Sequence, residues 1–108
     1  MIMPPPQVLL DYFAAANEGR IDDAAVCFAP DALVHDENSD HQSSAAIRAW
    51  IEDTTLKYRP QVEVHRMEAA DEGFAATGTV SGTFPGSPVP LHYTFTVRDG
   101  KITRLIIS

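Results

Sequence analysis

Two residues of this sequence have a type and a spacing that suit proton transfer, and the first is Asp36. It ends a short run in which Ala32 and Val34 share its face, because strand side chains alternate with period two. This spacing directs the carboxylate toward an apolar interior, where loss of water disfavours its charged form and suits it to accept a proton. The alternative is that Asp36 opens the polar segment 37–43 and caps a turn.

The second residue is Tyr12, which lies on the apolar stripe of a predicted helix ending at Gly19. The stripe has three- and four-residue spacing and contains Val8, Leu9, Tyr12, Phe13 and Ala16. A tyrosine in this position is either a packed core residue or a donor that stabilises an oxyanion opposite Asp36. Tyr93, on a later strand, is predicted to face the same interior.

The elements that must position these residues follow from the same periodicities. Pro, Gly and Ser residues separate them. The sequence predicts helices over 7–19 and 22–29, a strand over 31–36, a loop over 37–43, a helix from 43 or 44 to about 59, and strands over 62–70, 74–84, 89–98 and 101–107. Turns are expected at 71–73, 85–86 and 99–100.

The last two strands form a hairpin around Asp99-Gly100, which is typical of a type I′ turn. A regular register pairs Tyr93 with Ile106 on the inner face and leaves Leu105 and Ile107 outside. A bulge would swap these faces. Two apolar side chains on an outer face predict that a second copy covers them. We therefore expect a homodimer through the sheet, with Thr79 and Thr94 in the interface.

Helices followed by a run of strands predict an α+β fold, in which three N-terminal helices pack on a curved, cone-shaped antiparallel sheet. The 108 residues are expected to form one domain, 1–108. Such a cone leaves an apolar pocket at its wide end. The residues predicted to line it are Tyr12, Val34, Asp36, Trp50, Phe84 and Tyr93.

Composition narrows the class of partner. The chain is 44% hydrophobic and has a net charge of −7 with no cluster of Lys or Arg, which disfavours nucleic acid. No stretch has membrane-spanning length, and the first residues lack the pattern of a signal peptide. Cys27 is the single cysteine and cannot form an internal disulfide. These features favour a cytoplasmic protein that binds a small molecule.

The segment from His35 to His41 is rich in residue types that bind metals, with Asp36, Glu37 and Asp40 between the two histidines. Adjacent strand residues point to opposite faces, so these side chains do not converge, and we expect a solvated loop and no metal. Phosphate-loop, dinucleotide-binding and nucleophile-elbow spacings are absent from the sequence, and no cofactor is predicted.

From about Val8 to Ile107 the sequence resembles the NTF2-like superfamily, specifically its SnoaL-like and ketosteroid isomerase-like members. The resemblance is carried by Tyr12-Phe-Ala-Ala-Ala-Asn-Glu-Gly19, Phe28-Ala-Pro-Asp-Ala32 leading to Asp36, Ala45-Ala-Ile-Arg48 and Asp99-Gly-Lys-Ile102. It implies the cystatin-like cone fold. It identifies the activity less sharply, because this fold serves isomerases, cyclases, hydrolases, dehydratases and binding modules.

Within this superfamily, ketosteroid isomerases have an oxyanion-stabilising tyrosine in a Tyr-x-Ala-Ala-x-Asn-x-Gly setting, which Tyr12 matches, and a general-base aspartate that Asp36 matches. Their further aspartate, on the strand before the final hairpin, corresponds here to Tyr93 or His92, and neither is a carboxylic acid. The resemblance implies an isomerase or cyclase that abstracts a proton next to a carbonyl of a small apolar substrate. The alternative is a binding or accessory module without turnover.

Overall fold

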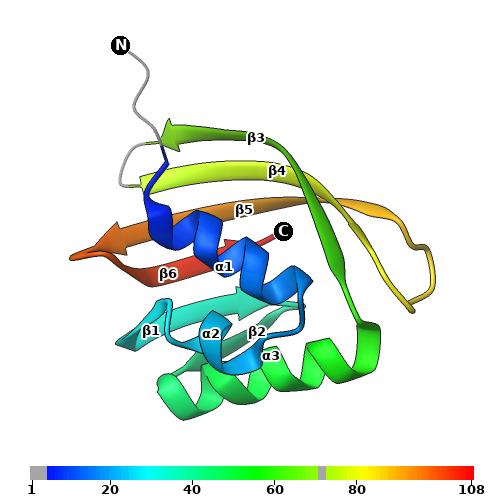
Figure 1. Ribbon diagram of the computed structural model, residues 1–108, viewed down its shortest axis with the longest axis horizontal. Helices are drawn as coiled ribbons and strands as arrows, with labels where there is room; N and C mark the ends of the chain where they lie inside the picture. The colour runs from blue at the N-terminus through cyan, green and yellow to red at the C-terminus, as the bar shows by residue number, and fades with distance from the viewer. Residues whose placement is uncertain (1–4, 71–72) are drawn as a thin grey trace.

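The computed structural model describes residues 5–70 and 73–108. Within them the chain forms three helices and six strands (Figure 1). In order, these are α1 Gln7–Asn17, α2 Ile21–Ala25, β1 Phe28–Asp36, β2 Ser39–Gln42, α3 Ser44–Tyr58, β3 Gln61–Ala70, β4 Gly73–Ser81, β5 Val89–Arg98 and β6 Lys101–Ile107. The predicted α+β class is confirmed. The turn predicted at 71–73 includes residues 71 and 72, which lie outside the described residues.

The helices of the described chain begin and end where local chemistry dictates. The Ser43 hydroxyl accepts a hydrogen bond of 3.2 Å from the Ala46 amide, so Ser43 is the N-cap of α3. Pro6 precedes α1, and Gly19, with φ +70°, follows its end. None of the described helices has both the length and the apolar composition needed to cross a membrane.

The sheet has the strand order β2-β1-β6-β5-β4-β3. Every neighbouring pair is antiparallel except β1 and β6, which run parallel, so the predicted purely antiparallel sheet is wrong in this one pair. The parallel pairing is possible because α3 and the strands β3 to β5 supply the long connection that parallel neighbours require. β1 thereby lies beside the last strand of the chain.

The segment predicted as a loop over 37–43 instead contains β2, which pairs with β1. Glu37 and Asn38 form the two-residue turn of this hairpin, with φ values of +52° and +62°. Val34 lies opposite His41, and His35 lies opposite Asp40. The residues of β2 are polar and lack alternating apolar residues, so their sequence carries no strand signal.

The sheet curls around α1, which lies on its concave face, while α2 and α3 lie near β1 and β2 (Figure 1). The bend in β3 and β4 depends on Gly78, as expected for a glycine inside a strand. A Cβ at Gly78 would lie 2.7 Å from the Glu63 carbonyl oxygen. The register of β3 shifts opposite this point, between Val64 and Arg66.

The hairpin of β5 and β6 departs from the predicted register. Asp99 and Gly100 have φ values of +53° and +76°, which confirms the type I′ turn. The register shifts at Thr96 and Val97, and Thr103 is the extra residue of β6. As a result Phe95 lies opposite Leu105, and Tyr93 lies opposite Ile107. Leu105 is therefore on the inner face and is 0% exposed.

This bulge removes the argument that predicted the homodimer. Leu105 needs no second copy to cover it, because the helices of the same chain already do. Ile107 is half-buried and contributes to an internal cavity, and Ile106 takes its place on the outer face. The homodimer stays a prediction, without these two residues to support it.

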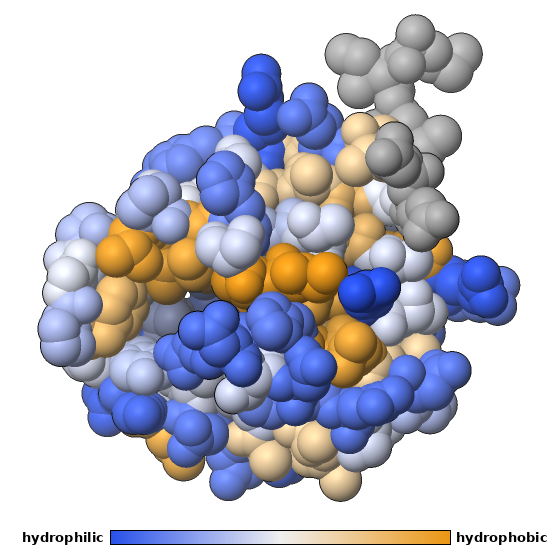
Figure 2. Space-filling model, turned by 180° about the vertical axis from the view of Figure 1, so that it is seen from behind, coloured by the Kyte–Doolittle hydropathy of each residue, from blue (hydrophilic) through white to orange (hydrophobic). Residues whose placement is uncertain are grey.

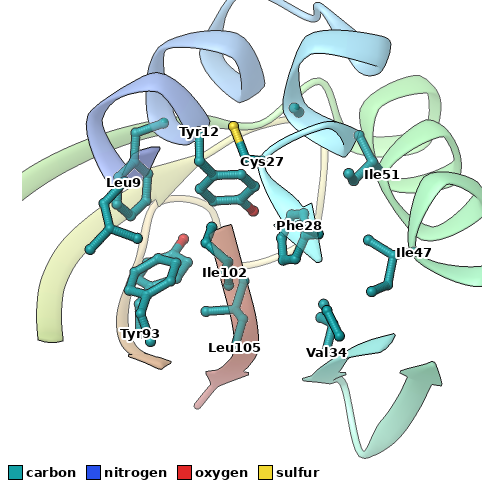
Figure 3. Close-up of a cluster of buried hydrophobic side chains, with 14 of the residues drawn as sticks. Leu9, Tyr12, Cys27, Phe28, Val34, Ile47, Ile51, Tyr93, Ile102 and Leu105 are labelled. Carbon is teal, nitrogen blue, oxygen red and sulfur yellow. The ribbon is translucent and has the colours of Figure 1, made fainter. Parts of the chain in front are cut away.

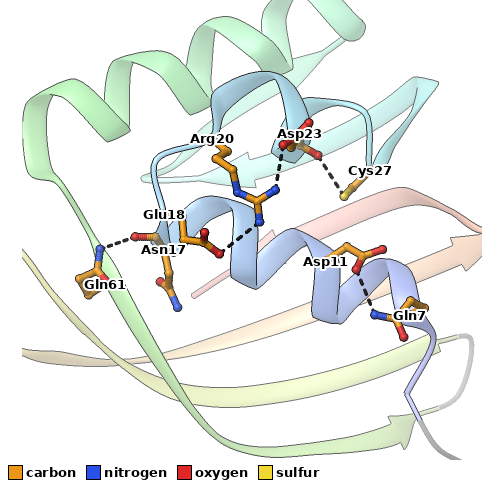
Figure 4. Close-up of polar contacts among 8 residues, drawn as sticks. All are labelled: Gln7, Asp11, Asn17, Glu18, Arg20, Asp23, Cys27 and Gln61. Atoms are coloured by element: carbon orange, nitrogen blue, oxygen red, sulfur yellow. Dashed lines mark hydrogen bonds and ion pairs between the residues drawn. The ribbon is translucent and has the colours of Figure 1, made fainter.

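The core lies between α1 and the concave face of the sheet, where aromatic rings pack edge to face (Figure 3). Phe13 of α1 contacts the ring of Tyr93 with centroids 5.3 Å apart and that of Phe95 at 5.7 Å. Tyr12 lies 5.5 Å from Phe28 and 6.1 Å from Phe95. The helical stripe predicted from the sequence is thus the side of α1 that builds the core.

Candidate functional site

A cavity of about 550 Å³ lies between α1, α3 and the concave face of the sheet. Figure 2 shows a hollow at the left of that view, bordered by apolar side chains (orange) on one side and by hydrophilic side chains (blue) on the other. The cavity lining is mainly apolar and aromatic, as in most small-molecule sites. It consists of Tyr12, Ala16, Asp36, Glu37, Trp50, Ile51, Thr54, Thr55, Tyr58, Pro60, Val62, Val80, Phe84, Pro85, Val89, Leu91, Tyr93 and Ile107.

The structure brings five of the six predicted pocket residues together at this cavity: Tyr12, Asp36, Trp50, Phe84 and Tyr93. Val34 was predicted to line it as well, and this is wrong. Val34 is 0% exposed and belongs to the core with Ile47 and Leu105 (Figure 3). It does share the inward direction of Asp36, but it lies two residues earlier on β1, which pairs with β6 there and packs against α3.

The Asp36 carboxylate is held by Trp50 of α3. The indole Nε1–H donates a hydrogen bond of 3.0 Å to Asp36 Oδ2. On its other side the Trp50 ring stacks on His41 of β2, with centroids 5.9 Å apart and planes at 28°. Because His41 pairs with Val34, it lies on the inner face of the β1–β2 hairpin. Asp36 therefore does not simply cap a turn: it is half-buried, and an indole fixes its orientation.

The rest of the charged segment divides between the two faces of the same hairpin. His35 and Asp40 lie on the outer side, where the imidazole Nδ1 is 2.6 Å from Asp40 Oδ1. Within residues 5–70 and 73–108, no three His, Cys, Asp or Glu side chains gather as a metal site would require. The alternation of strand side chains explains this separation.

Two phenolic hydroxyls face the cavity from the side opposite α3. Tyr12 and Tyr93 both line it, although their rings are 6% and 5% exposed. Neither oxygen has a hydrogen-bond partner among the described residues. Neither is fully buried, so both oxygens are accessible from the cavity that the two residues line. Figure 3 shows both oxygens directed into the space between α1 and the sheet. They are donors available to a ligand.

The electrostatic surroundings keep both phenols protonated. Burial raises the pKa of Tyr12 far above its ordinary value, and the neighbouring Tyr93 and Asp36 raise it further. Burial likewise raises the pKa of Tyr93, and the Asp36 charge adds to the effect. The Asp36 carboxylate thus acts on both tyrosines, which places the three groups in one electrostatic environment.

Position 93, rather than 92, faces the cavity. Tyr93 is buried on the inner face, whereas His92 is exposed on the outer one. Where the isomerase resemblance expects a carboxylic acid, this chain therefore presents a second phenol. A phenol donates a hydrogen bond to a ligand oxygen, as a protonated carboxylic acid would.

Sequence reasoning missed several lining residues. Tyr58 contacts Phe84 edge to face with centroids 5.7 Å apart, so these rings form one wall. Trp50, Thr54 and Tyr58 follow one another at four-residue spacing on α3, and this spacing was a usable signal. Ile107 carried no such signal, because its direction depends on the bulge.

The chain belongs to the SnoaL-like domain family, whose pattern matches residues 9–105. It is 37% identical to a proposed polyketide cyclase from Sinorhizobium meliloti, over 95% of this chain and 94% of that one, with a TM-score of 0.91. A proposed polyketide cyclase from Xanthomonas campestris is 26% identical over 94% of this chain and 86% of that one, with a TM-score of 0.81.

The fold is shared more widely than the sequence. A Catenulispora acidiphila protein with a ketosteroid isomerase-like fold is 17% identical, with a TM-score of 0.85 over 97% of this chain and 86% of that one. Similarity at this level concerns the fold alone. A comparison with curated proteins found no match.

Proposed function

We propose that this protein binds a small apolar molecule with a carbonyl group and abstracts a proton from the carbon next to that carbonyl. Asp36 is the general base, and Tyr12 with Tyr93 stabilises the resulting enolate oxygen. The observation that carries the proposal is that the Asp36 carboxylate lies on the same mainly apolar cavity as two phenols, neither of which has a hydrogen-bond partner among the described residues. Membership of the SnoaL-like family supports a reaction of this class.

The chemistry begins when the Asp36 carboxylate takes the proton and the electrons of the broken C–H bond move to the carbonyl oxygen. Trp50 donates to one carboxylate oxygen, Oδ2, and leaves Oδ1 to accept the proton. The two phenols donate to the enolate oxygen, where negative charge develops. Their raised pKa values keep them neutral, so they act as hydrogen-bond donors and not as bases.

Two outcomes are open to the enolate. If Asp36 returns the proton to a different carbon, the double bond moves and the reaction is an isomerisation. If the enolate carbon attacks a second carbonyl of the same molecule, a carbon–carbon bond forms, the first carbonyl is restored, and the oxygen of the second takes the proton from Asp36, so the reaction is a cyclisation. Proposed polyketide cyclases among the similar structures support the second outcome. Both outcomes share the first step, which is therefore the step to measure.

The competing function is a binding or accessory module without turnover. The observation that favours it is that Tyr93, and not a carboxylic acid, occupies the position that corresponds to the isomerases' additional aspartate. Two phenols can bind a carbonyl oxygen without any proton transfer from carbon. The two functions differ in whether the carbon next to the carbonyl exchanges its hydrogen with solvent.

Solvent deuterium exchange tests the proposal directly. β,γ-Unsaturated ketones, steroidal and smaller, are incubated with the protein in D₂O, and exchange is followed by NMR. The wild type is expected to accelerate exchange, and Asp36→Asn to lower the rate by about 10²–10⁴-fold, because general-base catalysis contributes on that order. Asn keeps the shape of the side chain but accepts no proton.

Circular dichroism and ligand affinity serve as controls for Asp36→Asn, and both are expected to stay near wild type. A wild type that binds the ketones but exchanges no faster than Asp36→Asn contradicts the enzyme and leaves the binding module.

A further inference from the structure

The charges on the cavity are all of one sign. Among its described lining residues the charged ones are Asp36 and Glu37, and none is Lys, Arg or His. The remaining side chains are apolar, aromatic or hydroxyl-bearing. A ligand that enters therefore meets carboxylates, rings and hydroxyls, but no cationic side chain.

Neither carboxylate forms an ion pair within the described chain. Asp36 accepts from the neutral indole of Trp50, and Glu37 takes part in none of the ion pairs. A nearby cation is that of Lys57, whose Nζ is 5.1 Å from the centroid of the Tyr58 ring. The charges of Lys57 and Glu37 act on each other, since the pKa of Lys57 is raised chiefly by Tyr58 and in smaller part by Glu37. Lys57 is exposed and does not line the cavity, so the charged side chains of the described lining itself are all negative.

The two carboxylates occupy different depths. Asp36 is half-buried and fixed by Trp50, whereas Glu37 is exposed in the tight β1–β2 turn, with φ +52°. Glu37 therefore stands at the rim and Asp36 inside. A negatively charged ligand would have to pass Glu37 and approach Asp36 while losing its own water, and no cationic side chain of the described lining would compensate.

We propose that Asp36 and Glu37 make the cavity select ligands by charge. It takes a carbonyl compound whose acid groups are absent or esterified, and it rejects the free acid. An amine-bearing ligand is tolerated, because aromatic rings and carboxylates both attract a cation. The carbonyl group rests on the function proposed above, but the charge selection requires no turnover.

Three matched probes test the selection: methyl 2-naphthoate, 2-naphthoate and 2-(aminomethyl)naphthalene, which share one ring system and differ in charge. Dissociation constants are measured at pH 8 by fluorescence titration. The ester and the amine are expected to bind, and the acid to bind at least about tenfold more weakly, as one unfavourable charge contact of 1.4 kcal/mol produces.

Glu37→Gln is expected to lower the ratio of the dissociation constants of the acid and the ester by about threefold to fivefold. This is the effect of one unit charge that acts over a few ångströms through water. Glu68→Gln is the matched control. It removes the same charge from an exposed site on β3 that does not line the cavity, and it should leave the ratio of the two dissociation constants unchanged.

An acid that binds as tightly as the ester overturns the inference. The inference is also overturned if none of the three probes binds, or if Glu68→Gln lowers the ratio of the acid and ester dissociation constants as much as Glu37→Gln does. If the probes bind in the expected charge order but the protein does not accelerate deuterium exchange, the charge selection is supported and the proposed function is contradicted. If the protein accelerates deuterium exchange but binds the acid as tightly as the ester, only the charge selection is contradicted.

Discussion

The two sides of the cavity are built differently. On the side of the phenols, Tyr12 and Tyr93 are held by ring packing against Phe13 and Phe95, deep in the core. On the other side Asp36 ends a strand, is half-buried, and depends on one hydrogen bond from Trp50. The proposed oxyanion donors are thus positioned by many weak contacts, and the proposed base by one directional contact.

This difference predicts how each side responds to mutation. A residue held by ring packing cannot move without loss of stability, because the contacts that position it are also contacts that stabilise the core. A residue held by one hydrogen bond can be disturbed with little effect on folding. Changes to the packing on the phenol side should therefore lower stability, and loss of the hydrogen bond on the carboxylate side should lower activity with little change in stability.

The largest expected effect is that of Phe95→Ala, which removes the ring between Tyr12, Phe13 and Tyr93. Phe95 is 1% exposed, so the free energy of unfolding should fall by about 3–5 kcal/mol in urea titrations. Leu56→Ala is the control, because Leu56 is 71% exposed and its loss should cost within about 0.5 kcal/mol. Equal losses in both variants would contradict the packing account.

Removing the phenolic oxygens tests the donors without emptying the core. The double variant Tyr12→Phe, Tyr93→Phe should lower kcat for deuterium exchange by about 10²–10³-fold, the size found when an oxyanion donor is removed. Each single variant should lose less, since one donor remains. If either single change costs as much as both together, the phenols do not share the oxyanion.

On the carboxylate side, Trp50→Phe keeps an aromatic ring beside His41 but removes the donor to Asp36. Without this donor the carboxylate is free to turn away from the substrate, so kcat should fall by about tenfold to a hundredfold, the scale of a small misplacement of a reacting group. KM should change little, because the wall of the cavity stays in place. A raised KM with an unchanged kcat would make Trp50 a wall residue that does not position the base.

Alkaline unfolding returns to the phenols and gives the smallest effect for each residue. Unfolded tyrosines lose their proton near the ordinary pKa of 10.0, whereas burial keeps Tyr12 and Tyr93 protonated at higher pH. The native state then binds more protons than the unfolded one. Stability is therefore fully present below pH 10 and falls as pH rises above it.

By pH 11 the loss should reach about 1.4 kcal/mol for each buried phenol. Urea titrations at pH 8 and pH 11 measure it, and the double Phe variant should lose correspondingly less. An equal loss in wild type and double variant would show that these hydroxyls are not protected from ionisation.

Local pattern was enough to predict much of this molecule. The apolar stripe of α1 placed Tyr12 inward, alternation along β1 placed Asp36 on the inner face, and Asp99-Gly100 formed the expected turn. Each depends on residues within a few positions of one another, because helix and strand periodicities and turn conformations are properties of the local backbone.

Tertiary structure decided what depends on distant segments. The bulge at Thr103 turned Leu105 and Ile107 inward, β2 formed from polar residues only because β1 offered an edge, and Val34 was covered by α3. The contact between Trp50 and Asp36 belongs to the same class, since two elements must meet before an indole can reach a carboxylate. The sequence by itself determined which residues of α1 and β1 face inward. Packing between elements decided which of those residues form the core and which line the cavity. The reason is that only three-dimensional contact distinguishes a covered side chain from one that borders a cavity.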